Sequence, residues 1–322
     1  MGLVIPAKAP NPETAIEDYR LPGTDNAPKG RHIEMDILNL MGPPAAGSLL
    51  AAVLAVDLLI ATVCVLCVVF LTVWVVVYAG PLALGGCPAR RNRLPVYAPL
   101  LCLAAWQILA SLVMGAIRYV MEGFPPGALE SANYIANTVI NLLMIGAILF
   151  VAWRFFAGRL KGFGLDLRTV AGDFAAAIVN FIAVLPLVWL GVVIVDFVGK
   201  LVDPAFEIGV NEGLDALKQT PYPAMKVLML TYLAVGVPVL EEFLFRGLIQ
   251  STARSYLNSP WPAILITSFV FALMHPVSHW PAIFVLSVAM GYSYERSGSL
   301  FRPVFIHIFF NATTVCATLL SN

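Results

Sequence analysis

The sequence predicts an all-α integral membrane protein, a polytopic bundle of about eight transmembrane helices. Hydrophobic residues make up 60% of the chain and charged residues 12%, whereas soluble domains have roughly 45–50% apolar and about 25% charged residues. The mean hydropathy is +0.86. Apolar runs near the roughly 20 residues that cross a bilayer recur along nearly all 322 residues. Membrane lipids are therefore the expected surroundings of this chain.

Eight apolar segments predict the individual helices, because each approaches the length of a membrane span. In chain order they are Leu49–Tyr78, Val96–Ile117, Tyr134–Trp153, Phe174–Val198, Ala224–Leu248, Pro262–His275, Pro281–Tyr294 and Phe301–Leu320. The sixth and seventh are short for a full span. We expect them to be tilted, to be extended by neighbouring residues, or to end inside the protein.

Composition divides the chain into three parts. Residues 1–47 are rich in proline, charge and turn formers, which predicts a disordered tail without a cleavable signal peptide. Residues 48–200 are expected to form the N-terminal transmembrane helices, and residues 222–320 the part that carries the chemistry. Within the second part, segment 162–170 mixes Phe and Leu with Asp and Arg, so it is predicted to lie on the cytoplasmic membrane surface.

Charge excludes one class of partner and orients the chain. The formal net charge is zero, so binding to nucleic acid has no electrostatic support. One set of alternate loops holds eleven Lys and Arg residues, and the other holds eight, four of them in the N-terminal tail. The eleven are Arg90, Arg91, Arg93, Arg154, Arg159, Lys161, Arg168, Arg246, Arg254, Arg296 and Arg302. Because positive loops tend to remain cytoplasmic, we predict a multi-pass cell-membrane protein with both termini extracytoplasmic.

The fifth apolar segment carries charges that the membrane makes costly. An ionisable group at membrane depth needs a partner, a water-filled cavity or a function. Glu242 and Arg246 are four residues apart, so they share a helix face and can form an ion pair. Glu241 points about 100° away from Glu242 and lacks that partner. One carboxylate is therefore expected to be structural and the other available for chemistry.

Two later segments add polar side chains at the same depth. Phe271 lies one turn before His275 on one face, and His307 lies one turn before Asn311 on another. If the fifth helix continues past Gln250, four polar side chains can converge in the cytoplasmic half of the bilayer. These are Glu241, His275, His307 and Asn311.

The three motifs together resemble a known family. Glu-Glu-x-x-x-Arg, Phe-x-x-x-His and His-x-x-x-Asn, each on a separate late helix, are similar to the CPBP family of CAAX-prenyl-protease-like and bacteriocin-processing intramembrane peptidases. The resemblance extends over residues 222–320, with no departure at the motif positions. It implies a glutamate-type endopeptidase that hydrolyses a peptide bond of a membrane-associated protein or peptide, which can be lipidated or CAAX-like.

The resemblance also implies a role for each residue. Glu241 and His275 would activate water, while His307 and Asn311 would stabilise the oxyanion. The side-chain chemistry agrees, because a histidine and an asparagine can direct N–H donors toward one point. Three further residues would support the catalytic residues without contacting the substrate, namely Glu242, Arg246 and Phe271.

The residue types leave a metal mechanism open beside the metal-free one. Glu241, His275 and His307 are a sensible set of zinc ligands that would leave a fourth position for water. The sequence contains no HExxH motif, so the usual helical zinc-protease pattern is absent. We therefore expect no cofactor, with zinc as the alternative.

Three other functions remain beside the peptidase. A non-catalytic member of the same family would act in resistance, immunity or scaffolding, but the complete set of polar residues argues against it. A transporter would use paired broken helices in two halves, whereas the polar residues here gather near one end of the sequence. A serine protease would use Ser293 in Gly291-Tyr-Ser293 with His307, but this tripeptide is short.

Overall fold

The computed structural model describes residues 90–209 and 222–320, together with isolated positions between 62 and 88 and at 217 and 220. All of them belong to one compact unit, Ala61–Asn322. The tail predicted at residues 1–47 lies outside the described residues. Of the predicted span Leu49–Tyr78, only positions 62, 65 and 69 are described, and each is helical.

The predicted fold class is confirmed, since the described residues form helices and no β-strand. The bounds of the helices are α3 (Ala98–Val120), α4 (Pro126–Phe155), α5 (Arg159–Phe163), η4 (Leu167–Thr169), α6 (Val170–Val202), α8 (Pro223–Thr231), η5 (Tyr232–Gly236), α9 (Val237–Glu242), η6 (Phe243–Gln250), α10 (Ser251–Leu257), α11 (Pro260–Leu273), η7 (Val277–His279), α12 (Trp280–Ser297) and α13 (Phe301–Leu320). Each of the seven predicted segments from Val96 onward coincides with a helix. Five helices of the described part are long and apolar enough to cross a membrane, and α11 and α12 are not among them.

The elements α8, η5, α9, η6 and α10 run on as one long helix of 35 residues, Pro223–Leu257. Two stretches of it, η5 and η6, are π-helical and therefore wider than an α-helix. Pro238 explains the first stretch, because a proline has no N–H and its ring collides with the carbonyl four residues earlier. The two glutamates end α9, so they lie between the two widened stretches.

This long helix continues well past its predicted end at Leu248. Polar residues end the apolar run there, but Gln250, Ser251, Thr252 and Arg254 are all buried. The helix ends instead at Asn258, which adopts a left-handed conformation with φ of 52° just before Pro260. Buried polar side chains can thus belong to the interior of a membrane helix, where hydropathy alone predicts a loop.

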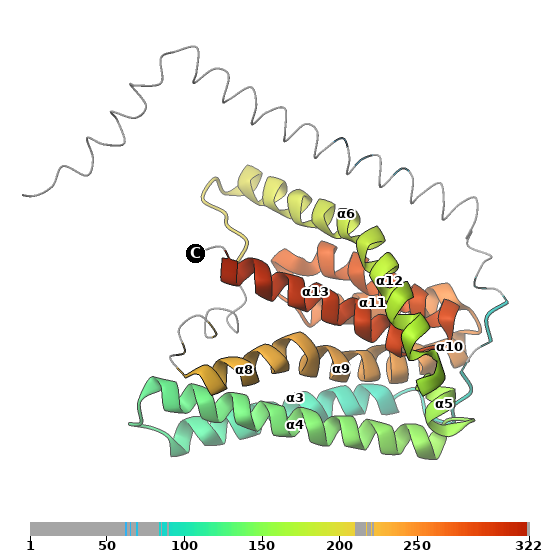
Figure 1. Ribbon diagram of the computed structural model, residues 1–322, viewed down its shortest axis with the longest axis horizontal. Coiled ribbons are helices and arrows are strands. Elements are labelled where there is room, and N and C mark those ends of the chain that lie inside the picture. The colour runs from blue at the N-terminus through green and yellow to red at the C-terminus, as the bar shows by residue number, and fades with distance from the viewer. Residues whose placement is uncertain are drawn as a thin grey trace, which may run out of the picture. The chain divides into compact units, whose positions relative to one another are not determined.

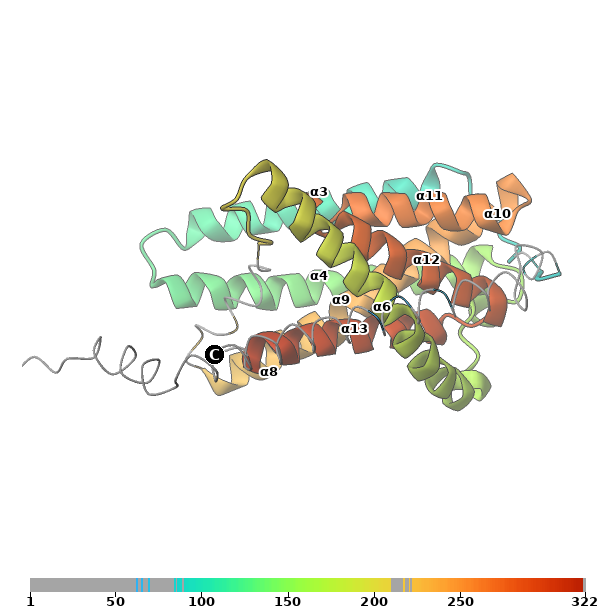
Figure 2. The ribbon, with the colours of Figure 1, turned by 90° about the horizontal axis from the view of Figure 1, so that it is seen from above.

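The last helices surround the long helix on the side away from the α3–α4 hairpin. Helix α11 packs on α12, and α6 crosses both α12 and α13 (Figures 1 and 2). Helix α13 in turn contacts α9 and η5, and η6 contacts α11 and α12. The segment that carries the glutamates, α9, therefore meets α13 and α4, and the stretch that follows it, η6, meets α11 and α12.

The loops with the basic residues gather at one end of the bundle. The Arg93 N–H donates to the Phe155 carbonyl at 3.1 Å, and the Leu300 N–H donates to the Gly164 carbonyl at 2.9 Å. These bonds join the chain before α3 to the end of α4, and the α5 region to the start of α13. The loops of the set with more basic residues therefore lie at the same end of the bundle. Which side of the membrane they occupy stays a prediction.

Two of the eleven basic residues counted toward that orientation are buried inside the bundle. Arg246 is fully buried within η6, and Arg254 is buried within α10, where its Nε lies 3.9 Å from Glu295 Oε2. Eleven less these two leaves nine basic residues against eight. The charge bias that favours extracytoplasmic termini is thus smaller than the sequence alone indicates.

The segment predicted to be interfacial divides into inward and outward residues. Phe163 is fully buried and packs against η6 at Gly247, where any larger residue would collide with its ring. Leu167 is 79% exposed. Next to it, hydrogen bonds from the exposed Arg168 lower the pKa of Asp166 to about 2. The segment thus anchors one aromatic ring in the bundle and exposes an apolar and charged surface.

Candidate active site

A buried ion pair forms the base of the site. Arg246 Nη1 donates to Glu242 Oε1 at 2.6 Å, and neither side chain is exposed. The same carboxylate oxygen lies 2.8 Å from His307 Nδ1. Since a carboxylate oxygen only accepts, Nδ1 of His307 carries the hydrogen of this bond. The four-residue spacing of Glu242 and Arg246 therefore gives the predicted pair, and His307 joins it from α13.

Glu241 lies on the other side of the same histidine. Its Oε2 atom is 3.7 Å from His307 Nε2, and its side chain is 14% exposed, against 0% for Glu242. The imidazole thus stands between two carboxylates, with one nitrogen toward each. Because Nδ1 holds the hydrogen, Nε2 can donate only when the ring carries both protons, and otherwise it accepts. Any oxyanion role of His307 requires the doubly protonated ring.

Phe271 joins the two histidines through its ring. The centroid of its ring is 4.8 Å from that of His275 and 5.8 Å from that of His307. On the same fully buried ring, the guanidinium carbon of Arg246 lies 4.6 Å from the centroid. His275 follows the end of α11, half-buried, and its Nδ1 lies 2.9 Å from the Phe271 carbonyl. Its other nitrogen remains available for the site.

Asn311 faces the long helix but is not in contact with the carboxylates. Its Nδ2 donates to the Leu233 carbonyl of η5 at 3.0 Å. A π-helical turn offers carbonyls outside the usual α-helical hydrogen-bond pattern, and this one accepts from a side chain. The structure thus brings Glu241, Glu242 and His307 into contact, with His275 linked through Phe271. The amide of Asn311 instead points to the carbonyl of Leu233, which lies eight residues before Glu241.

Polar contacts that the motifs did not predict extend from the site along α12. Arg246 Nη2 donates to the hydroxyl oxygen of Ser287 at 2.6 Å. One turn further, Gln250 Nε2 donates to the Gly291 carbonyl at 3.0 Å and to Glu295 Oε1 at 3.1 Å. The sequence could have indicated these contacts through polar residues and a glycine that recur every four positions on both helices. On the long helix they are Glu242, Arg246, Gln250 and Arg254, and on α12 they are Ser287, Gly291 and Glu295. We call these seven residues the polar seam.

Three further polar residues, Ser293, Asp196 and His279, lie outside the polar cluster. The Ser293 hydroxyl donates to the Met290 carbonyl of its own helix at 2.8 Å, which gives no support to a serine nucleophile. Asp196 pairs with Lys200 at 2.8 Å on the exposed part of α6. His279 is half-exposed in η7, and its Nδ1 lies 3.1 Å from the hydroxyl oxygen of the neighbouring Ser278.

The ligand geometry for a metal is incomplete. Among the described residues, no three His, Cys, Asp or Glu side chains form a group that could hold a metal ion. Of the residues considered for zinc, Glu241 and His307 lie close together, but His275 directs Nδ1 to a carbonyl of its own chain.

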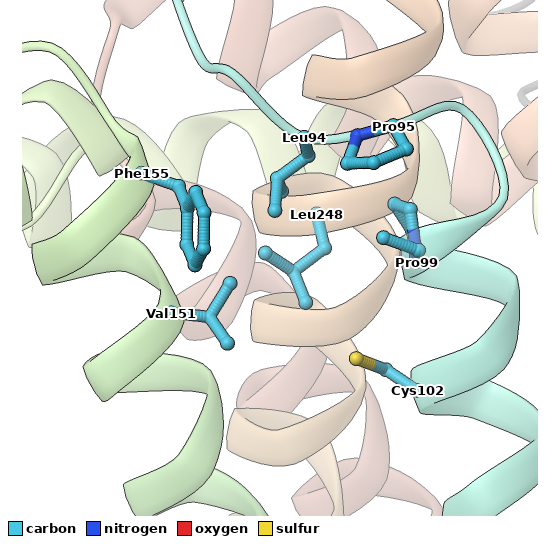
Figure 3. A pocket seen from close by; sticks show the side chains of 8 residues that line it. Leu94, Pro95, Pro99, Cys102, Val151, Phe155 and Leu248 are labelled. Atoms are coloured by element: carbon cyan, nitrogen blue, oxygen red, sulfur yellow. The ribbon is translucent and has the colours of Figure 1, made fainter.

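A crevice of about 190 Å³ lies away from these polar groups. Its lining is wholly apolar and comes from α3, α4, η6 and the chain before α3 (Figure 3). Leu248 reaches it from the opposite face of the helix that carries Arg246. The lining of this crevice holds no carboxylate or imidazole and a single thiol, that of Cys102, so the candidate active site is the polar cluster and not the crevice.

A family model identifies the same part of the chain. Residues 223–313 match the model described as type II CAAX prenyl endopeptidase Rce1-like. This range includes all three motifs, so the resemblance that they indicate is confirmed. The matched segment is thus similar to a domain of this endopeptidase family, and the five long apolar helices indicate a protein embedded in the membrane. No curated protein and no solved structure matches the chain.

Proposed function

We propose that the protein is an intramembrane endopeptidase that uses a glutamate to activate water. The observation that carries this proposal is the difference between the two adjacent carboxylates. Glu242 is fully buried and fixed by Arg246 and His307, whereas Glu241 is 14% exposed and is not part of the Arg246 ion pair. A general base must reach water and accept a proton, and of the two only Glu241 retains that freedom.

In the proposed mechanism, Glu241 takes a proton from a water molecule while the oxygen of that water attacks the scissile carbonyl carbon. His275 helps to orient that water through its free ring nitrogen. The proton then passes to the leaving amine, so that the peptide bond breaks and a carboxylic acid and an amine remain. His307 and Asn311 would donate to the oxyanion of the tetrahedral intermediate. For this, Asn311 must exchange its bond to Leu233 for one to the substrate.

We further propose that the reaction needs no metal. The support is the arrangement of possible ligands: His307 Nδ1 is committed to Glu242, and His275 Nδ1 to the Phe271 carbonyl. Glu242, Arg246 and Phe271 act behind the site, by holding His307 and the histidine ring planes. The zinc alternative would require His275 and Glu241 to converge with His307 on one point.

The proposed substrate is a membrane-associated peptide, with a lipidated CAAX-like C-terminus as the first candidate. The support is the name of the matching family, a type II CAAX prenyl endopeptidase. Both termini of the enzyme are proposed to be extracytoplasmic, which would place the basic end of the bundle in the cytoplasm. A reporter fused after Leu320 would detect the reverse orientation.

Cleavage mapping tests the proposal directly. The full-length protein in liposomes is incubated with a prenylated peptide that ends in a CAAX sequence, and with the same peptide without the prenyl group. Mass spectrometry should detect a new C-terminus with the wild type and not with Glu241→Gln. Cleavage of neither peptide, nor of a library of membrane-anchored peptides, would favour the non-catalytic role in resistance, immunity or scaffolding.

A further inference from the structure

A serine on α12 lies at the far end of a chain of polar contacts that leads to the candidate base. Ser287 is fully buried, and its hydroxyl oxygen accepts from Arg246 Nη2 at 2.6 Å. The same guanidinium donates from Nη1 to Glu242 Oε1 at 2.6 Å. That oxygen also accepts from His307 Nδ1 at 2.8 Å, and His307 Nε2 lies 3.7 Å from Glu241 Oε2.

We propose that Ser287 is a positioning residue for this site. It fixes the guanidinium of Arg246, and through Arg246 and Glu242 it sets the direction in which His307 faces Glu241. The inference rests on the proposed function, because it assigns Ser287 to the same reaction. Ser287 is not in contact with the reacting groups, so its effect must pass through Arg246.

The geometry explains why the guanidinium needs this contact. The ring of Phe271 lies 4.6 Å from the guanidinium carbon of Arg246 and limits tilting of its plane. Stacking leaves rotation within that plane free. Two contacts on different nitrogens stop this rotation, namely Glu242 on Nη1 and the Ser287 hydroxyl on Nη2. The Ser287 carbonyl, at 3.3 Å from Nη2, is a longer and weaker substitute.

The rotation matters because Glu242 Oε1 is shared by Arg246 and His307. If the guanidinium turns, the carboxylate follows it, and the histidine loses its direction toward Glu241. A displacement of about 1 Å at a catalytic group can cost on the order of 10²-fold in rate. We therefore expect loss of the Ser287 hydroxyl to lower turnover without a matching change in substrate binding.

The polar seam supplies a matched control. Gln250 joins the same two helices one turn further on, through the Gly291 carbonyl and Glu295. Gly291 permits this approach, since a Cβ there would lie 2.7 Å from Gln250 Oε1. The hydrogen bonds that Gln250 donates go to Gly291 and Glu295, and not to Glu242 or His307. A substitution here weakens the helix contact and leaves the chain of contacts to the site intact.

The experiment compares four variants of the full-length protein in liposomes with a peptide that the wild type cleaves. Ser287→Ala should lower kcat about tenfold with KM within about twofold of the wild type, and Ser287→Thr should restore more than half of the turnover. Gln250→Met should lower Tm at least as much as Ser287→Ala, with kcat within about twofold. Ser293→Ala, a buried serine on the same helix, should change neither quantity. If Ser287→Ala cannot be recovered folded, Ser287→Cys replaces it with the same expected loss.

A double-mutant cycle tests the route through Arg246. In an Arg246→Lys background, Ser287→Ala should lower kcat by less than about threefold, because the group that Ser287 orients has changed. Unchanged kcat in Ser287→Ala would overturn the proposal. So would an equal loss of kcat in Gln250→Met, or a full tenfold loss in the Arg246→Lys background. The proposed function fails separately, if Glu241→Gln keeps near-normal turnover.

Discussion

Two faces of the long helix differ in how they hold the bundle together. On one face, Arg246 and Gln250 reach α12 through hydrogen bonds of 2.6 to 3.3 Å. On the opposite face, Leu248 meets α3 and α4 around a crevice that is wholly apolar (Figure 3). Contact on the first face thus depends on directional hydrogen bonds and charge, and contact on the second depends on how well apolar side chains fit together.

The chemical difference between the two faces distinguishes residues proposed to act in the reaction from residues that only pack, whereas the exposed fraction of the side chains does not. Arg246 and Leu248 are two residues apart and are both buried. In lipid, apolar surfaces gain little by meeting each other, so the apolar face contributes mainly van der Waals contact. The polar face carries groups that are costly to bury, and they need a reason to be there. The proposed reaction supplies that reason, and five substitutions or treatments can break or sharpen the comparison.

The largest effect is expected for Glu241→Gln. The amide keeps the size of the carboxylate but cannot accept a proton from water, so turnover should fall by roughly 10²–10⁴-fold. Yield and thermal stability should remain nearly normal, because Glu241 is not part of the buried ion pair. Single-turnover cleavage and thermal unfolding in detergent measure the two quantities. Near-normal turnover would show that another group is the base.

Glu242→Gln should fail in the opposite manner. It leaves Arg246 fully buried without its counter-charge, and removing one partner of a buried pair costs about 3–5 kcal/mol. Lower yield and a lower unfolding temperature should accompany any loss of activity. A stable but inactive Glu242→Gln, together with an unstable but active Glu241→Gln, would reverse the two assignments.

Asn311→Ala tests a donor at the edge of the polar face. If Asn311 stabilises the oxyanion, turnover should fall by about 10²–10³-fold. Stability should fall by only about 1 kcal/mol, the usual contribution of one hydrogen bond, here that to Leu233. Thr314→Ala is the matched control on α13, since its hydroxyl bonds only to the Phe310 carbonyl. A loss of turnover no larger than that of the control would assign Asn311 to packing.

Leu248→Ala tests the apolar face. Truncating a buried leucine costs about 2–5 kcal/mol, and the lower end is expected because the residue already borders a crevice. Turnover per folded molecule should change by less than about threefold, since the face holds no directional contact with the site. Thermal unfolding and active-site titration separate the two effects. A selective loss of kcat would mean that the apolar face also positions the site.

A strong chelator should have the smallest effect. With a glutamate as the base and no metal, treatment with the chelator should leave turnover unchanged, and purified protein should lack stoichiometric zinc. Elemental analysis and a cleavage assay before and after treatment measure both. Activity that is lost with the metal and returns with zinc would replace the metal-free mechanism.

The sequence predicted the helices better than their ends. Hydropathy located the seven segments after residue 90, because each must present apolar side chains to lipid. It ended the fifth at Leu248 because Gln250 and Arg254 are polar, and it counted Arg246 and Arg254 among loop residues. Hydropathy sums side chains along the chain and cannot see that a polar group finds its partner on another helix.

The sequence by itself determined the class of protein, the ion pair of Glu242 with Arg246 and the set of candidate residues. These follow from composition and from four-residue spacing within one helix, which are local properties. Only the tertiary structure decided that His307 stands between the two carboxylates and that Ser287 holds Arg246. Those contacts join residues 41 to 66 positions apart. Their geometry depends on how α12 and α13 pack against a helix widened by two π-helical stretches, which no local pattern records.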